Sequence, residues 1–130
     1  MGIAERIRVM IVDDQVTSRL LLTEAMQQLG FRHINVAKDG VEALETLIRE
    51  PHQLVVSDFN MPRMDGLALL KAVRENSLTK KTAFIILTAQ GDRALVQKAA
   101  ALGANNVLAK PFTLEKMRAS LEAVFGVLEL

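Results

Sequence analysis

The chain has 130 residues, enough for one domain with a sizeable buried core and too few for two typical domains. Its 16 basic and 15 acidic residues leave a formal net charge of +1, so overall charge gives no reason to expect a nucleic-acid or membrane partner. The absence of cysteine excludes disulfides and cysteine-ligated zinc or iron–sulfur sites, and agrees with a reducing compartment.

The first residues, Met1 to Arg6, contain no apolar stretch long enough for a signal peptide. Arg6 stands where an N-myristoylation motif needs Ser or Thr. No apolar run approaches the roughly 20 residues of a membrane-spanning helix. We therefore expect a cytoplasmic protein that has no membrane partner.

Short apolar runs alternate with longer stretches of helical periodicity, a pattern typical of repeated strand–helix units and a parallel sheet covered on both faces. A nearly continuous apolar run predicts a buried strand at 7–12. Helical periodicity follows at 16–29, and Gly30 is placed to end that helix in a left-handed conformation. Three leucines at 20–22 cannot all face the core, so one could be exposed. The favoured interpretation is a wide core stripe, and the alternative is a contact for the kinase or its phosphotransfer domain. A second strand is predicted at 33–37.

Asp39 and Glu42 have the spacing of a capped helix start. The expected apolar stripe of this helix consists of Val41, Leu44, Leu47 and Ile48. Pro51 ends the helix, and the apolar run at 53–57 predicts a third strand that leads into Asp58.

The third predicted helix follows a loop containing Pro62, and its apolar positions recur at helical spacing: Leu67, Leu70 and Val73. The remaining predicted elements are a strand at 83–88, an alanine-rich helix from about 92 to Gly103, a strand at 106–109 and a last helix capped by Thr113. The expected stripe of the last helix consists of Leu114, Met117, Leu121, Val124 and Leu128.

Polar residues stand where the predicted strands end, and they are Asp13-Asp14, Asp58, Thr88 and Lys110. Because parallel strands deliver their carboxyl ends to one edge of a sheet, we expect these side chains to share a pocket. Crowded carboxylates attract a divalent cation, and hard oxygen ligands suit Mg²⁺. Asp14 and Asp58 could ligate it directly, and Asp13 through water. Each residue alone could be an ordinary cap, turn or surface residue, so the interpretation depends on their combination.

A carboxylate in such a pocket can also attack phosphorus and form an acyl phosphate. Lys110 and the Thr88 hydroxyl could then hold the phosphoryl oxygens, so that positioning and charge neutralisation supply most of the catalysis.

Four blocks in this order carry a family resemblance: VMIVDD at 9–14, SDFNMPRMDG at 57–66, LTA at 87–89 and GANNVLAKPF at 103–112. With this spacing the chain resembles the receiver domain of two-component response regulators, in the single-domain CheY-like form, over essentially its whole length. The resemblance implies a flavodoxin-like α/β fold, a three-layer (βα)5 sandwich around a five-stranded parallel sheet of order 2-1-3-4-5. It also implies that residues 1–130 form a single receiver domain.

The resemblance further implies that Asp58 accepts a phosphoryl group from a phosphohistidine on a CheA-like histidine kinase, with Mg²⁺ as cofactor. The residues implied in the site are Asp13, Asp14, Asp58 and the Asn60 backbone carbonyl for the metal, and Thr88 and Lys110 for the phosphoryl group. The Lys110–Pro111 peptide is expected to be cis. Asn60 and Gln90 flank the path of attacking water in this family, so we expect them to set the lifetime of the acyl phosphate.

Two positions depart from the family pattern. Val107 stands where activated receivers usually rotate an aromatic residue inward, and a valine has no hydroxyl and few rotamers. Gln15 likewise replaces an aromatic residue often seen after the acidic pair. Output could instead depend on movement of the segment 88–91, through contacts with a downstream target such as a flagellar motor component. The alternative is that the chain serves as a phosphate sink for a chemotaxis kinase.

Two other classes of function remain open. A small Mg²⁺-dependent phosphatase with an aspartate nucleophile, of the haloacid-dehalogenase type, would need a second acid at the position of Asn60. A pseudo-receiver adaptor would not need the complete set of acids, Thr88 and Lys110. We therefore expect a monomeric signalling switch in chemotaxis that catalyses its own phosphorylation and dephosphorylation, rather than a conventional turnover enzyme or a nucleic-acid-binding protein.

Overall fold

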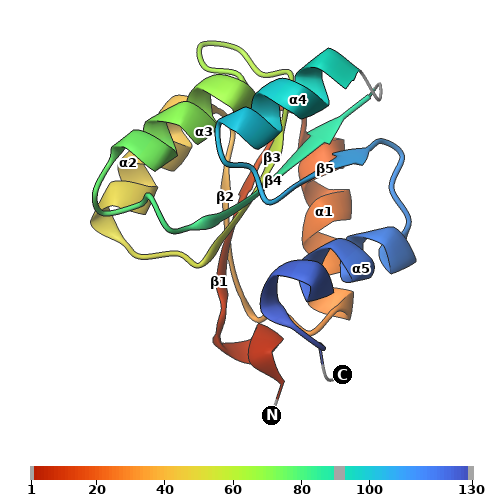
Figure 1. Cartoon of the computed structure of the whole chain (residues 1–130). Helices are drawn as coiled ribbons and strands as arrows, with labels where there is room; N and C mark the ends of the chain where they lie inside the picture. The colour runs from red at the N-terminus through yellow and green to blue at the C-terminus, as the bar shows by residue number, and fades with distance from the viewer. Residues whose placement is uncertain (1, 90–92, 129–130) are drawn as a thin grey trace.

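The computed structural model describes residues 2–89 and 93–128. Within this part of the chain a short 3-10 helix at Ile3–Arg6 precedes strands and helices that alternate. The strands are β1 Arg8–Val12, β2 His33–Ala37, β3 Leu54–Asp58, β4 Ala83–Thr88 and β5 Asn106–Ala109. The helices are α1 Val16–Gln28, α2 Gly40–Arg49, α3 Gly66–Glu75, α4 Arg93–Ala101 and α5 Leu114–Phe125. Figure 1 shows their arrangement.

Over the described residues the strands form one parallel five-stranded sheet of order β2-β1-β3-β4-β5. This order and the alternation with helices confirm the predicted flavodoxin-like fold. Asp58 pairs with Leu87, and Thr88 pairs with Ala109 one residue before Lys110, so the polar strand ends come to one edge of the sheet.

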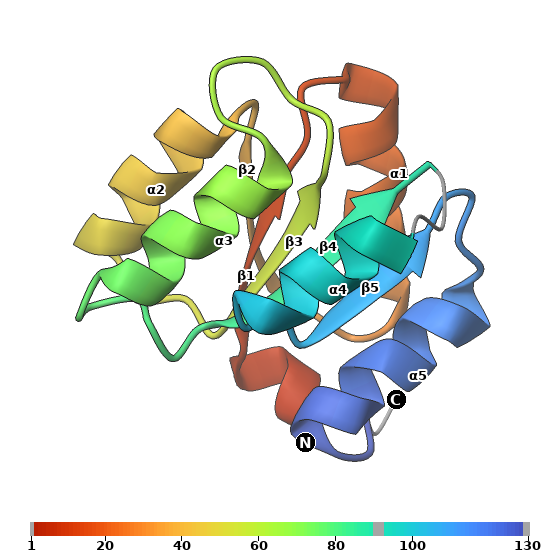
Figure 2. The same ribbon diagram turned by 45° about the horizontal axis from the view of Figure 1, so that its top comes forward.

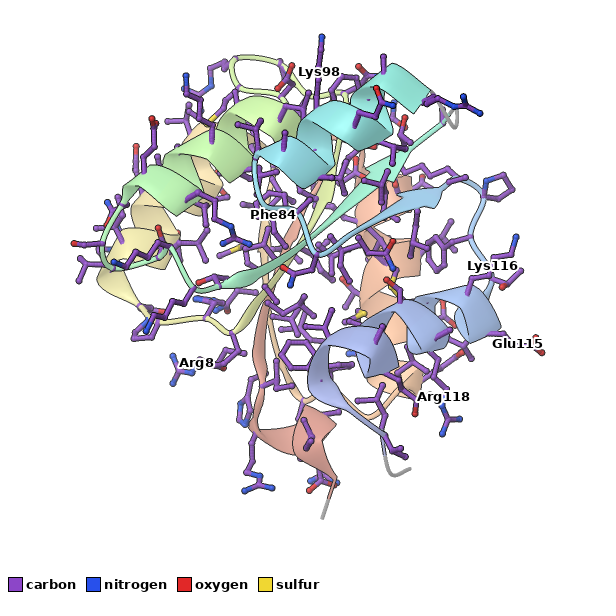
Figure 3. The ribbon with its side chains drawn as sticks, viewed as in Figure 1. Arg8, Phe84, Lys98, Glu115, Lys116 and Arg118 are labelled. Atoms are coloured by element: carbon purple, nitrogen blue, oxygen red, sulfur yellow. The ribbon has the colours of Figure 1, made fainter. Side chains whose placement is uncertain are left out.

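Helices cover both faces of the sheet and make three layers (Figures 1 and 2). One core cluster joins α1 and α5 to the sheet through side chains such as Leu22, Met26 and Leu121. The other joins α2, α3 and α4 to the opposite face, where Phe84 is fully buried (Figure 3). Burial on both faces explains why the central strands are almost continuously apolar.

Several side chains predicted to be buried are exposed instead. Leu20 and Leu21 are 64% and 58% exposed, because the buried stripe of α1 starts at Leu22 and continues at helical spacing. The favoured interpretation of a wide core stripe over 20–22 was wrong, because two of the three leucines are exposed. Ile48 lies beside, rather than on, the buried face of α2, and Leu114 is the first residue of α5, at the edge of its packed face.

The predicted helix caps are confirmed where the structure describes them, but the last helix ends at Phe125 instead of continuing to Leu128, because Gly126 turns the chain with a φ of +86°. Gly30 and Gly103 both have a φ of +97°, which only glycine adopts readily, and each is the second residue after the end of its helix, α1 or α4. The Asp39 carboxylate accepts a bond from the Glu42 amide, and Thr113 caps α5 in the same way. The predicted start of the fourth helix at residue 92 lies outside the described residues. Across 2–89 and 93–128, none of the helices has the length and apolar character required to cross a membrane.

Candidate functional site

The acids predicted to meet do meet. Asp13 and Asp14 follow β1, and Asp58 ends β3. One carboxylate oxygen from each lies within 4.8 Å of the others, which is close enough for a shared cation. Asp13 is fully buried, Asp58 is half-buried and Asp14 is exposed, so the cluster opens to solvent on the side of Asp14.

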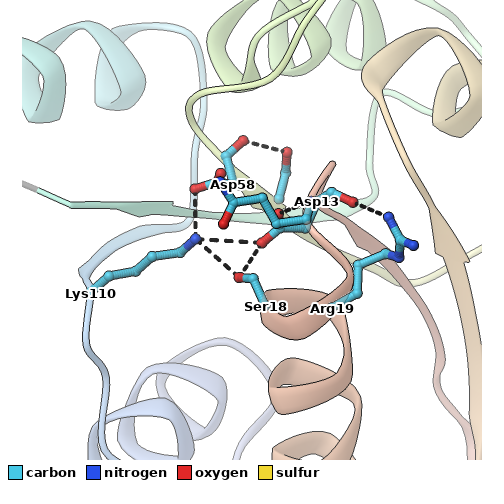
Figure 4. Close-up of polar contacts among 7 residues, drawn as sticks. Asp13, Ser18, Arg19, Asp58 and Lys110 are labelled. Atoms are coloured by element: carbon cyan, nitrogen blue, oxygen red, sulfur yellow. Dashed lines mark hydrogen bonds and ion pairs between the residues drawn. The ribbon is translucent and has the colours of Figure 1, made fainter.

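The Lys110 ammonium contacts two of these acids, Asp58 and Asp13 (Figure 4). Its Nζ is 3.0 Å from Asp58 Oδ1 and 3.4 Å from Asp13 Oδ2. The backbone amide of Lys110 also donates to the Thr88 carbonyl at 2.7 Å, which fixes the lysine at the end of β5. The Lys110–Pro111 peptide is cis, as predicted.

The start of α1 holds Asp13 through three contacts, two of which come from residues that sequence reasoning missed. The Gln15 amide donates to Asp13 Oδ1 at 3.0 Å, so this acid also caps the helix entry. The Ser18 hydroxyl donates to Asp13 Oδ2 and accepts from Lys110 Nζ at 3.2 Å. Arg19 Nη1 donates to the Asp13 carbonyl at 2.8 Å. The available signal was that the first turn of a helix after a strand lies over the same edge of the sheet.

Opposing effects act on Asp58. Burial raises the pKa of its carboxyl, and the neighbouring Asp13 raises it further. The hydrogen bond and positive charge of Lys110 lower the pKa, but burial is the larger effect and the net shift is upward. The carboxylate is thus partly desolvated and has one cation beside it.

A cleft of about 590 Å³ opens in front of the acids, lined by Asp14, Asp58, Asn60 and Lys110 among others. Thr88 is nearly fully buried and lines an adjoining hollow of about 380 Å³, which Asn60 also borders. The predicted residues Asp14, Asp58, Asn60 and Lys110 therefore share one cleft, while Thr88 lies next to it.

The backbone around Asp58 is held tightly by its neighbours. The Phe59 amide donates to the Leu87 carbonyl, and the Gly66 amide donates to the Phe59 carbonyl, each at 2.8 Å. A Cβ on Gly66 would lie 2.7 Å from the Asp58 carbonyl oxygen. The start of α3 therefore packs directly on Asp58. Only glycine at position 66 lets the two backbone segments approach this closely.

Val107, the predicted switch position, lines neither of the two hollows beside the acids. Val107 is half-buried in β5 and packs against the layer of α2, α3 and α4. Gln90, and Gly91 in the segment predicted to move, lie outside the described residues.

The donor set at this edge suits Mg²⁺ better than a softer metal. Asp13, Asp14 and Asp58 offer carboxylate oxygens, and the exposed loop after Asp58 can add a carbonyl oxygen. Within residues 2–89 and 93–128, these three acids are the one group of three or more side chains that could hold a metal ion. Neither histidine belongs to it. The residues present thus fit a hard divalent cation.

Comparison with known proteins decides the family. A family model described as the response regulator receiver domain matches residues 9–122. The chain belongs to the response regulator receiver family. The family expected from the motif blocks is therefore confirmed. Phosphorylation of an aspartate with Mg²⁺ is the general behaviour of these receivers.

Relatives of this receiver are chemotaxis proteins. “Probable chemotaxis protein CheY” of Rhizobium etli is 67% identical over 129 residues, covering 99% of this chain and 100% of the relative. Chemotaxis protein CheY1 of Helicobacter pylori is 37% identical over 120 residues, or 92% of this chain and 97% of the relative. The receiver is therefore of the CheY-like chemotaxis type that the sequence indicated.

Solved structures of such proteins share the fold. The BeF3-activated CheY2–Mg²⁺ structure from Sinorhizobium meliloti has 70% sequence identity and a TM-score of 0.75, covering 99% of this receiver and 100% of that chain. CheY4 of Vibrio cholerae has 34% identity and a TM-score of 0.84, covering 91% of this receiver and 98% of that chain. Mg²⁺ is thus bound by a neighbour that aligns over nearly the whole chain.

Proposed function

We propose that Asp58 is the phosphoacceptor of this receiver. The observation that carries the proposal is the Lys110 ammonium 3.0 Å from Asp58 Oδ1, inside a cluster of three acids at the cleft. Asp13, Asp14, Asp58 and the Asn60 carbonyl would hold Mg²⁺, and Lys110 and Thr88 would bind the phosphoryl group. When bound, Mg²⁺ would screen the repulsion between the acceptor carboxylate and the incoming phosphoryl oxygens.

In the proposed reaction an Asp58 carboxylate oxygen attacks the phosphorus of a phosphohistidine. The oxygen–phosphorus bond forms as the nitrogen–phosphorus bond breaks, and the histidine ring is the leaving group. Lys110 already contacts Asp58, so a small movement of its flexible side chain would bring the ammonium to a phosphoryl oxygen. Hydrolysis of the acyl phosphate then restores the carboxylate.

Intact-mass measurement after incubation with acetyl phosphate and Mg²⁺ tests this proposal. A stoichiometric acceptor gains one phosphoryl group per chain, whereas a phosphatase turns over many donor molecules and a pseudo-receiver gains none. We expect Asp58→Ala to abolish the added mass, with Glu45→Ala, at an exposed position of α2, as a folded control that also lacks one acid. Undiminished labelling of Asp58→Ala would refute the assignment.

The proposed phosphodonor is a CheA-like histidine kinase, and the proposed target is a motor component, both acting with residues 1–130 as a single, monomeric receiver in the cytoplasm. Val16, Leu20 and Leu21 on α1 are all more than half exposed, and Leu21 borders an apolar hollow with Lys110 and Phe112. An apolar helix face beside the cleft supports docking of the donor there. Transfer from purified candidate kinases to wild type and to Leu20→Ser/Leu21→Ser tests this, with acetyl phosphate labelling as the control.

The lifetime of the acyl phosphate is assigned to Asn60 and Gln90. Asn60 is exposed at the cleft, where an amide can orient water but is a poor base. Charge-altering substitutions, Asn60→Lys and Gln90→Lys, should change the rate at which label is lost. The exposed Gln28→Lys at the far end of α1 serves as the control. Unchanged hydrolysis in both variants would end this assignment.

A phosphate sink is the second candidate function, and Val107 is the observation that favours it. This half-buried valine cannot make the aromatic rotation expected of activated receivers. Nuclear magnetic resonance of the BeF3-treated chain separates the two candidates. Shifted amide signals in α4 and β5 support an output through helix movement, whereas shifts confined to the cleft support the sink.

A further inference from the structure

The loop between β3 and α3 begins directly after Asp58 and carries Asn60 over the cleft. At both ends it is tied to the sheet and to α3 by the backbone bonds of Phe59 and Gly66. Its middle is fastened differently, to the first residues of α2. Arg63 Nη2 lies 2.6 Å, and Nε 3.2 Å, from the same oxygen of Asp39, Oδ2.

The Asp39 carboxylate serves both elements at once. Oδ1 accepts the Glu42 amide at 2.9 Å and so caps α2, while Oδ2 receives the Arg63 guanidinium. The Asp39 side chain is only 6% exposed although Arg63 is 57% exposed, so one end of the pair is shielded from solvent. A pair with a shielded end and two guanidinium contacts is less weakened by water and salt than an ordinary surface pair.

Arg63 adopts a backbone conformation that needs support. Its φ is +66°, in the left-handed region that residues other than glycine rarely occupy. A backbone bond from the Met64 amide to the Pro62 carbonyl, at 2.7 Å, closes the turn at Arg63, and the side-chain bonds to Asp39 fasten this turn to the start of α2. The neighbouring Met64 also packs closely on α2, since a Cβ on Gly40 would lie 2.9 Å from Met64 Cβ and Cγ and 3.0 Å from its carbonyl oxygen.

We propose that Arg63 and Asp39 form a clamp that positions residues 60–62 over the cleft and thereby sets the affinity for Mg²⁺. Arg63 is a positioning residue, because it acts through the Asn60 carbonyl and does not touch the acids. This inference rests on the proposed role of that carbonyl as a ligand. Loosening the clamp lets the carbonyl move away from the acids and weakens Mg²⁺ binding, by about tenfold for the loss of a group that orients a ligand.

The test compares three single variants of the full chain and the double variant Asp39→Asn/Arg63→Gly. Asp39→Asn keeps a good cap for α2 but removes the charge that holds Arg63. Arg63→Gly removes the guanidinium and tolerates the left-handed conformation. Arg63→Lys keeps the charge without the planar fork and should restore part of the affinity. Arg32→Ala is the matched control, since it removes an exposed arginine from an ion pair away from the cleft, Arg32 with the half-buried Glu5 at 3.3 Å.

Calorimetric Mg²⁺ titration gives the dissociation constant, and amide hydrogen exchange without Mg²⁺ reports on the loop itself. We expect weaker Mg²⁺ binding and faster exchange at residues 60–64 in Asp39→Asn and Arg63→Gly, with no larger effect in the double variant than in either single one. Wild-type affinity in both folded single variants would overturn the clamp. If Asp39→Asn does not fold, Arg63→Gly against Arg63→Lys decides alone.

The outcome also separates the clamp from the proposed function. Absence of Mg²⁺ binding and of phosphorylation in the wild-type chain would contradict the proposed function itself. Normal wild-type behaviour with unaffected Arg63 variants would contradict the clamp alone. A lower unfolding free energy with unchanged Mg²⁺ affinity and loop exchange would show a merely structural ion pair and would also overturn it.

Discussion

The Lys110 ammonium bridges Asp58 and Asp13, two acids at the ends of different strands, at 3.0 and 3.4 Å. One cation thus offsets part of the repulsion at an edge where three carboxylates meet. Any divalent ion that enters the cluster competes with this ammonium for the same oxygens. Lys110 is therefore a candidate for binding the phosphoryl group, and it also competes with a metal ion for the carboxylate oxygens.

Replacement of this lysine should separate its two effects. Lys110→Met is expected to slow phosphorylation by acetyl phosphate on the order of 10²-fold, as for loss of one preorganised donor to a developing charge. The same variant should bind Mg²⁺ more tightly, because a competing positive charge is gone. Intact mass gives the rate and calorimetry the affinity. The exposed Lys116→Met on α5 controls for loss of charge, and weaker Mg²⁺ binding in Lys110→Met would contradict the argument.

Ser18 provides a second prediction, because its hydroxyl joins Asp13 to Lys110. Ser18→Ala should lower the free energy of unfolding by about 1 kcal/mol, the net worth of one hydrogen bond in a partly exposed place. It should also slow phosphorylation, since Lys110 loses a partner that orients it. Urea denaturation and labelling kinetics measure the two effects. Thr17→Ala, an exposed neighbour on α1, should change neither quantity.

The close contact of Gly66 with the backbone of Asp58 gives a third prediction. In Gly66→Ala the new methyl group would sit 2.7 Å from the Asp58 carbonyl oxygen, so α3 must move away. We expect a loss of about 2 kcal/mol in unfolding free energy, as for overpacking, together with slower labelling of Asp58. Ala68→Gly on the same helix controls for helix propensity without touching Asp58. Equal labelling rates in the two variants would count against a role for this contact.

The Asp39 carboxylate predicts a pH dependence of stability. The bond from the Glu42 amide lowers its pKa most, and Arg63 and Lys38 lower it further. A depressed pKa in the folded chain means that this stabilisation is present above the ordinary pKa of 3.8 and is lost as the pH falls through the folded value. Asp39→Asn should therefore be less stable than wild type near neutral pH, with a gap that narrows in acid. A gap that stays constant in urea titrations from pH 7 to below 4 would refute this assignment.

The sequence was sufficient to place the acids, because apolar runs such as Ala83–Thr88 define strands and parallel strands bring their ends together. Contacts between side chains distant in sequence were not predictable in this way. Nothing in the spacing of Asp39 and Arg63 indicates that they pair, and the partnership of Ser18 with Lys110 depends on the pitch of α1 over the sheet. The positive φ of Arg63 was not predictable either, because local preference opposes it in a residue other than glycine.

The spacing of apolar residues was also insufficient to predict which single side chains are buried. Leu20 and Leu22 differ by two positions and by nearly their whole exposure, 64% against 1%, because the sheet covers only one side of α1. Helical spacing identifies a stripe, but the width of that stripe depends on how closely neighbouring elements approach.

The sheet also separates two layers of helices. The exposed leucines belong to α1, on one face, whereas the loop after Asp58 leans on α2, on the other. A phosphodonor protein that binds to α1 therefore leaves the face covered by α2 unobstructed. Substitutions that block docking of the phosphodonor should consequently map to α1, and those that weaken Mg²⁺ binding through the loop should map to the start of α2.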